Sequence, residues 1–147
     1  MAAAKRRVLQ QVTKLLSKSP HSREEILETL DGLGEEAAAV ALLEALQDSD
    51  YRVRMMAAKY LGEICQDATV PALVESLSDS SKNVQRYAAD ALTCIGQPAV
   101  EPLLDALIGK DQAARKWAAE ALGNIGDRSV ALELVKRLND PNIEVQR

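Results

Sequence analysis

The sequence contains no phenylalanine, one tryptophan and one histidine among its 147 residues. A single histidine with no paired serine or cysteine argues against a nucleophilic triad. The chain also has no glycine-rich phosphate-binding loop. Acidic pairs such as Glu24-Glu25 and Glu35-Glu36 are frequent, but a run of charge on a helix is usually a solvated face. The sequence therefore predicts a protein that is not an enzyme and holds no cofactor or metal.

Long hydrophobic runs are also missing, and cysteine is scarce. No run of 18 apolar residues exists, so we expect no membrane-spanning segment. The apolar stretches near the N-terminus are too broken for a secretory signal. Cys65 and Cys94 have neither a metal-ligand spacing nor the pattern of a disulfide framework. We therefore expect two free, buried thiols and a cytoplasmic protein.

Acidic residues are absent from the first 23 residues, which hold six basic ones, whereas the whole chain has a net charge of −4. The rest of the chain therefore carries about −10, by formal charge counting at neutral pH. A basic start is compatible with a transit peptide or with an arm that contacts acidic partners. We favour a third interpretation, a solvated helix face, because an apolar stripe (Val8, Val12, Leu15, Leu16) lies opposite three cations (Arg7, Lys14, Lys18).

What the chain does have is a repeat. The segment 70–96 recurs up and down the sequence at a spacing of 30 or 31 residues. In the first half of the repeat unit, two apolar positions are always leucine. They are occupied by Leu42, Leu73, Leu103 and Leu134, and by Leu46, Leu77, Leu107 and Leu138. Fixed periods of this length usually indicate a solenoid, because each unit needs its neighbours to bury its apolar face.

Within each unit the apolar residues are spaced three and four apart, which predicts two amphipathic helices. We expect helices near 5–17, 22–33, 36–47, 51–64, 68–78, 81–95, 98–109, 111–125 and 128–139. The chain then forms one all-α domain, 1–147, of about four and a half two-helix repeats. It divides into a degenerate capping repeat 1–34, repeats 35–66, 67–96 and 97–126, and an incomplete repeat 127–147.

The last repeat is incomplete, because Val145-Gln146-Arg147 matches Val84-Gln85-Arg86 and the rest of the second helix does not follow. We expect the apolar stripe of Val130, Leu134 and Leu138 to be partly uncovered. The chain is then a fragment of a longer array, or another molecule covers this end. The bare stripe also allows self-association through it.

The second half of each repeat reads AAKYLGEIC at 57–65, AADALTCIG at 88–96 and AAEALGNIG at 118–126. This pattern resembles the HEAT-like repeats of the phycobilin lyase type. The resemblance implies a right-handed α-α superhelix in which second helices line the concave face. It also implies an Asp–Arg contact between repeats, which Val53-Arg54 can make and Val84-Gln85 cannot.

Two activities occur among proteins with similar repeats. Deoxyhypusine hydroxylase binds iron through His-Glu pairs, but the single histidine here, His21, is not followed by glutamate. Phycobilin lyases attach bilins to antenna proteins, yet nothing in this sequence marks a bilin site. An accessory or chromophore-handling role is therefore the alternative to our main interpretation, a non-catalytic interaction scaffold.

The candidate site consists of second-helix positions that the apolar pattern leaves outside the core. These partner-binding candidates are Arg52, Met55, Met56, Lys59, Asn83, Arg86, Tyr87, Asp90, Lys116, Trp117, Glu120 and Asn124. Large apolar residues beside arginine are typical of binding hot spots. Packed helices are about 8–10 Å apart, so Met56, Tyr87 and Trp117 can form one apolar ladder.

The alternative is that this ladder only completes the packing between repeats. Mixed charge around an apolar strip favours a protein or peptide partner over nucleic acid, because Arg86 and Lys116 alternate with Asp90 and Glu120.

Overall fold

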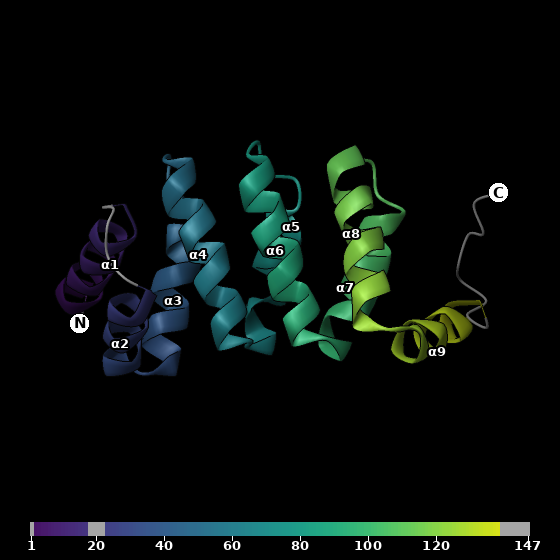
Figure 1. Ribbon diagram of the computed structural model, residues 1–147, viewed down its shortest axis with the longest axis horizontal. Helices are drawn as coiled ribbons and strands as arrows, with labels where there is room; N and C mark the ends of the chain where they lie inside the picture. Colours follow the sequence, from purple (N-terminus) through teal and green to yellow (C-terminus); the bar gives the residue numbers. More distant parts are fainter. Residues whose placement is uncertain (1, 18–22, 139–147) are drawn as a thin grey trace.

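The computed structural model describes residues 2–17 and 23–138 (Figure 1). These residues form nine α-helices and one short 3-10 helix, 67–69, with no strand among them. The helices are α1 (Ala2–Ser17), α2 (Arg23–Leu33), α3 (Glu35–Ala45), α4 (Tyr51–Ile64), α5 (Val70–Ser76), α6 (Lys82–Ile95), α7 (Gln97–Leu107), α8 (Gln112–Ile125) and α9 (Asp127–Leu138). The expected number and order of helices are confirmed for this part of the chain.

The helices are stacked in two layers. In Figure 1, α4, α6 and α8 lie in front, with α3, α5 and α7 behind them. Each front helix packs against the helix that precedes it, and α6 packs against both α4 and α8. The stack is extended, with α1 and α9 at opposite ends of the picture. The predicted all-α solenoid is therefore confirmed.

Helix starts follow from local chemistry. The Asp50 carboxylate accepts a hydrogen bond from the backbone N–H of Arg52, and Asp111 does the same for Ala114, so each side chain caps a second helix. Pro71 lies in the first turn of α5, where its missing N–H leaves no backbone group unpaired. The two aspartate caps fix where the front helices α4 and α8 begin, and therefore where their exposed side chains lie.

One repeat position at the end of each second helix has a positive φ. Gly34, Gly96 and Gly126 occupy it after α2, α6 and α8, with φ of 86°, 77° and 115°. After α4 the position is filled by Cys65, with φ of 51°. A side chain in this left-handed region costs about 1–2 kcal/mol relative to glycine. Cysteine therefore occupies a position at which this fold otherwise uses glycine.

Cys65 and Cys94 form a disulfide, with an S–S distance of 2.01 Å and a Cα–Cα distance of 6.1 Å. The expectation of free, buried thiols was wrong: Cys65 is half-buried and Cys94 is exposed. Their separation of 29 residues differs from the repeat period, so they occupy different repeat positions, and the packing of α4 against α6 brings them together. The cytoplasmic location loses the support of free thiols and stays a prediction.

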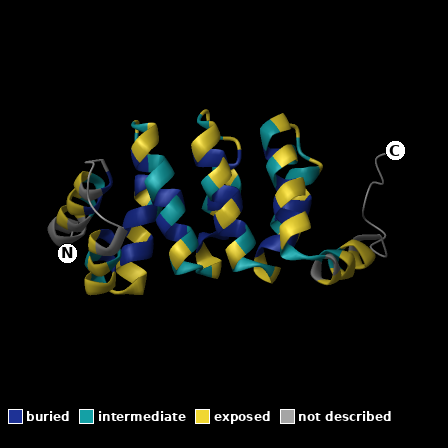
Figure 2. Ribbon diagram, viewed as in Figure 1, coloured by how far each residue is buried: buried dark blue, intermediate teal, exposed yellow. Residues whose placement is uncertain are grey.

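The core lies between the layers and is built from small residues and leucine (Figure 2). Ala57, Ala88, Ala118 and Leu92 are fully buried. At Gly62 a Cβ atom would stand 3.2 Å from Cα of Ala91, so α4 and α6 approach too closely for a larger residue to fit easily. Small side chains are thus what allow second helices to lie side by side.

The ends of the stack differ. On α1, Val12 and Leu16 are buried whereas Arg7 and Lys14 are exposed, which supports the solvated-face interpretation; Lys18 and His21 lie outside the described residues. On α9, Val130 packs against the core and Leu134 is 43% exposed, in agreement with a partly uncovered stripe; the side chain of Leu138, its third predicted member, lies outside the described part of the chain. Leu132 and Val135 are exposed as well. Among the described residues, no helix is both long and apolar enough to cross a membrane.

Candidate functional site on the second helices

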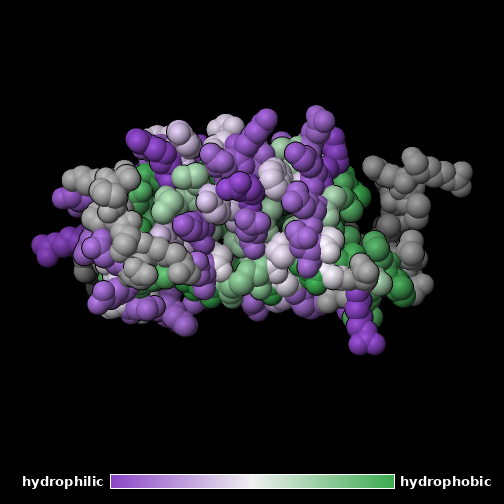
Figure 3. Space-filling view, viewed as in Figure 1, coloured by the Kyte–Doolittle hydropathy of each residue, from purple (hydrophilic) through white to green (hydrophobic). Residues whose placement is uncertain are grey.

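The twelve candidate residues all lie on α4, α6 and α8, and none of them is buried. We call the surface that they form the second-helix face; Figure 3 views the molecule from this side and shows hydrophilic side chains along the three front helices. Seven candidates are exposed: Arg52, Asn83, Arg86, Asp90, Lys116, Glu120 and Asn124. Five are half-buried: Met55, Met56, Lys59, Tyr87 and Trp117.

The proposed apolar ladder lies at the boundary between core and surface. Met56, Tyr87 and Trp117 are each half-buried and packed against the core. The indole Nε1 of Trp117 donates a hydrogen bond of 2.9 Å to Oε1 of Gln85, which is 9% exposed. Because α6 holds the indole in this way, the packing alternative gains support at Trp117. Because this side chain is half-buried, only part of it can contact a ligand.

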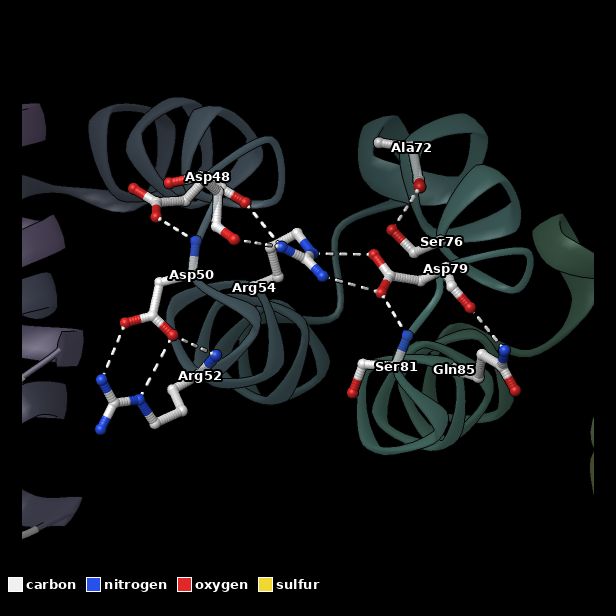
Figure 4. Close-up of polar contacts among 10 residues, drawn as sticks. Asp48, Asp50, Arg52, Arg54, Ala72, Ser76, Asp79, Ser81 and Gln85 are labelled. Carbon is white, nitrogen blue, oxygen red and sulfur yellow. Dashed lines mark hydrogen bonds and ion pairs between the residues drawn. The ribbon is translucent and has the colours of Figure 1, made fainter.

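An Arg–Asp ion pair connects the second repeat, 35–66, with the third, 67–96. Nε of Arg54 lies 2.9 Å from Oδ2 of Asp79, and Nη2 lies 3.2 Å from Oδ1 (Figure 4). Nη1 also donates a hydrogen bond of 2.8 Å to the backbone oxygen of Asp48. The guanidinium therefore also stabilises the turn that precedes its own helix, α4. The two side chains are only 14% and 13% exposed. Such a shielded, bidentate pair orients two adjacent repeats.

In the next repeat the contact is replaced rather than simply lost. Gln85 occupies the position of Arg54, and Gly109 occupies that of Asp79, so the carboxylate is missing as well. Nε2 of Gln85 donates to the backbone oxygen of Asp79, within its own loop, while Oε1 accepts from Trp117 in the following repeat. The predicted loss of the Asp–Arg contact is confirmed. The sequence signal for the replacement of this contact was that glutamine stands at the arginine position of one repeat, Gln85, and tryptophan in the next repeat, Trp117.

We expect Gln85→Ala to lower the free energy of unfolding by about 1–2 kcal/mol, because it removes one partner of a partly buried indole N–H. The emission of Trp117, the single tryptophan, should shift in the same variant, since its indole loses its acceptor. Urea denaturation followed by tryptophan fluorescence measures both. Asn83→Ala, an exposed change on the same helix, is the control; equal effects of the two changes would contradict this role for Gln85.

Arg52 contributes less charge to the face than the sequence suggests. Its Nη2 lies 3.1 Å from Oδ2 of Asp50. The pKa of Asp50 is lowered, first by the hydrogen bond from the Arg52 side chain and then by the one from the Arg52 backbone N–H. The same side-chain contact raises the pKa of Arg52. This cation is therefore neutralised locally by the residue that caps its own helix.

Basic residues are concentrated in the front helices and acidic residues in the back helices. The net charge of the whole chain does not reveal this separation. The front helices α4, α6 and α8 contain seven basic and three acidic residues, a formal charge of +4. The back helices α3, α5 and α7 contain six acidic residues and no basic one. The sequence held this signal in the alternation of acidic first helices with basic second helices.

Hollows lie between successive repeats. One of about 840 Å³, between the N-terminal ends of α6 and α8, reaches the second-helix face at Lys116 and Trp117. Another, of about 470 Å³, surrounds Arg54 and Asp79 at the turns between first and second helices, away from that face. Within residues 2–17 and 23–138, no three His, Cys, Asp or Glu side chains are grouped as a metal site requires. The chemistry offered here is therefore that of charge, hydrogen bonding and apolar contact.

A known enzyme has a similar fold. Human deoxyhypusine hydroxylase, solved in complex with glycerol, superimposes with a TM-score of 0.58 at 20% identity, over 99% of this chain and 50% of that chain. The likeness shows the fold alone, and this chain spans half the length of that enzyme. An engineered protein matches at 24% identity and a TM-score of 0.46, over 91% of this chain and 73% of that chain. No curated protein matches the sequence.

The sequence profile of HEAT repeats matches this chain twice, over residues 6–93 and 70–147. The two matches overlap and together cover nearly the whole sequence. They agree with the stacked pairs of helices and with the 30- to 31-residue period. The chain therefore belongs to the HEAT-repeat family.

Proposed function

We propose that this protein is a non-catalytic scaffold that binds a protein or peptide partner on the second-helix face. The observation that supports this most directly is the composition of the face. Exposed cations and carboxylates surround the half-buried Met56, Tyr87 and Trp117 across three neighbouring helices. Interfaces combine such apolar centres with polar rims.

A protein partner fits this face better than nucleic acid does. Asp90 and Glu120 follow Arg86 and Lys116 by one helical turn, so a row of carboxylates lies beside the row of cations. A phosphate backbone lying across the helices would meet both rows, and the carboxylates would repel it. A polypeptide can present acidic, basic and apolar side chains in matching rows.

The test is a pull-down from source-cell lysate with a variant that exchanges charges on the face. Arg86→Glu/Asp90→Arg keeps the net charge but reverses its direction across α6. We expect it to retain the partner at least about tenfold less strongly, which corresponds to about 1.4 kcal/mol.

The matched control is Glu133→Lys/Lys136→Glu, which exchanges an ion pair on α9 between the exposed Lys136 and the half-buried Glu133. Circular dichroism should show equal helicity in all three proteins. Equal retention by the parent and the α6 variant would contradict the proposal. A bilin recovered on the parent, seen as visible absorption, would instead support the chromophore-handling alternative, which the similarity to phycobilin lyase repeats suggested.

A further inference from the structure

We infer that the partner presents an acidic peptide segment, and that its carboxylates bind in the hollow between the N-terminal ends of α6 and α8. This inference rests on the proposed function, because it specifies the partner of the same face. We call this hollow the α6–α8 cleft. Its volume is about 840 Å³, within the range of typical ligand pockets. The side chains that matter here are Ser80, Lys82, Gln85, Lys116 and Trp117.

The carboxylates of the cleft are already engaged within the protein. Asp79 pairs with Arg54 and also accepts a hydrogen bond of 2.8 Å from the backbone N–H of Ser81. Asp111 accepts one of 2.8 Å from the backbone N–H of Ala114, which caps α8. Asp79 is thus neutralised by Arg54, whereas Asp111 keeps its negative charge. The two lysines of the cleft outnumber this one carboxylate, so the net charge left for a ligand is positive.

Lys82 and Lys116 are both exposed at the cleft. Neither forms an ion pair within 4.0 Å with any side chain that the structure describes. Nζ of Lys116 lies 5.3 Å from the centre of the Trp117 ring. A carboxylate bound between the lysines would therefore meet two cations, while an apolar neighbour in the same peptide could contact the indole.

The charge of the whole stack favours the same ligand. With Arg52 and Arg54 left out, because each pairs with an aspartate, the front helices still carry five basic and three acidic residues. The charged residues of the back helices are all acidic, so an acidic segment is attracted to the front and repelled from the back. Arg86 extends the basic row along α6, one turn beyond Lys82. The cleft is thus where the basic end of the second-helix face also offers depth and an aromatic wall.

The test uses the intact protein and two peptides of equal length, one alternating Glu and Leu and the other alternating Lys and Leu. Anisotropy of the labelled peptide gives the affinity. Quenching of Trp117, the single tryptophan, shows that the peptide lies in the cleft. We expect saturable binding of the acidic peptide alone, weakened by added salt, since exposed charges are screened.

Charge reversal at the cleft separates this site from general electrostatics. Lys82→Glu/Lys116→Glu should weaken the acidic peptide at least about tenfold, or 1.4 kcal/mol. Arg6→Glu/Arg7→Glu changes the net charge equally, on exposed residues of α1 at the far end of the stack, and should change affinity less than about twofold. Equal weakening by both variants would overturn the inference.

Other outcomes would overturn it as well. These are absence of saturable binding, equal binding of the lysine peptide, or tighter binding of a single-stranded oligonucleotide that the cleft variant loses. Dimerisation in sedimentation velocity that the cleft variant abolishes would assign the cleft to the acidic back face of a second copy. If the acidic peptide fails while the Arg86/Asp90 exchange still abolishes partner capture, the scaffold proposal stands and only this inference falls. If capture survives that exchange, the scaffold proposal falls instead.

Discussion

Reduction of the Cys65–Cys94 disulfide is expected to lower the free energy of unfolding by about 3.5 kcal/mol. The bond joins residues 29 apart in the sequence, and cross-linking a loop of this length removes that much chain entropy from the unfolded state. Urea denaturation with and without dithiothreitol measures the difference. Cys94→Ser should reproduce it without a reductant, and it should make the protein insensitive to dithiothreitol. An unchanged midpoint on reduction would contradict the expectation.

Replacing Cys65 by glycine should change the stability of the protein in opposite directions under reducing and oxidising conditions. Under reducing conditions Cys65→Gly should be more stable than the parent by about 1 kcal/mol, because glycine adopts a positive φ without a Cβ penalty. Under oxidising conditions it should be less stable than the parent, since the disulfide is lost. The reduced Cys94→Ser variant is the control, because it keeps cysteine at the position with positive φ. Equal stability of Cys65→Gly and Cys94→Ser would show that this backbone conformation costs nothing.

Loss of the Arg54 guanidinium is expected to destabilise the protein by about 3 kcal/mol. Arg54→Ala would leave the shielded Asp79 carboxylate without its cation and the Asp48 carbonyl without a donor. Thermal or urea unfolding of the variant measures the effect. The removal of one member of a buried pair is costly because the other charge stays desolvated.

Two further variants test this assignment. Asp79→Ala should cost a similar amount, and the double variant should cost much less than the sum, because the two changes remove one interaction. Arg52→Ala is the matched control: it removes an arginine two residues away whose ion pair with Asp50 is exposed, so the unfolding midpoint should barely move. Additive single changes, or an equal effect at Arg52, would contradict the role of the Arg54–Asp79 pair.

Much of the fold could be predicted because the same pattern of apolar and polar residues recurs in each repeat. The leucines at 42, 73 and 103 recur at one period, and all three are buried in the structure. The same periodicity separated Ala88 and Leu92 from their neighbours Arg86 and Asp90, and burial follows that division. Most polar positions of the second helices face outward, with the buried Gln85 as an exception, so much of the exposed side of α4, α6 and α8 was accessible to sequence reasoning.

The contacts between repeats were not accessible in the same way. Cys65 and Cys94 are 29 residues apart, Arg54 and Asp79 are 25 apart, and Gln85 and Trp117 are 32 apart. None of these separations is the period of 30 or 31, because each contact depends on how far one helix is shifted along its neighbour. That shift results from side-chain packing, such as Gly62 against Ala91, which no spacing in the sequence records.

The two junctions between front helices differ in how firmly they are tied. The junction of α4 with α6 is fastened near both ends, by Arg54–Asp79 where the helices begin and by the disulfide where they end. The junction of α6 with α8 has the single hydrogen bond between Gln85 and Trp117, near one end. Under a bending load the first junction should behave as a stiff block and the second as its hinge. The curvature of the stack would then change mainly at the α6–α8 cleft, where a bound segment could set it.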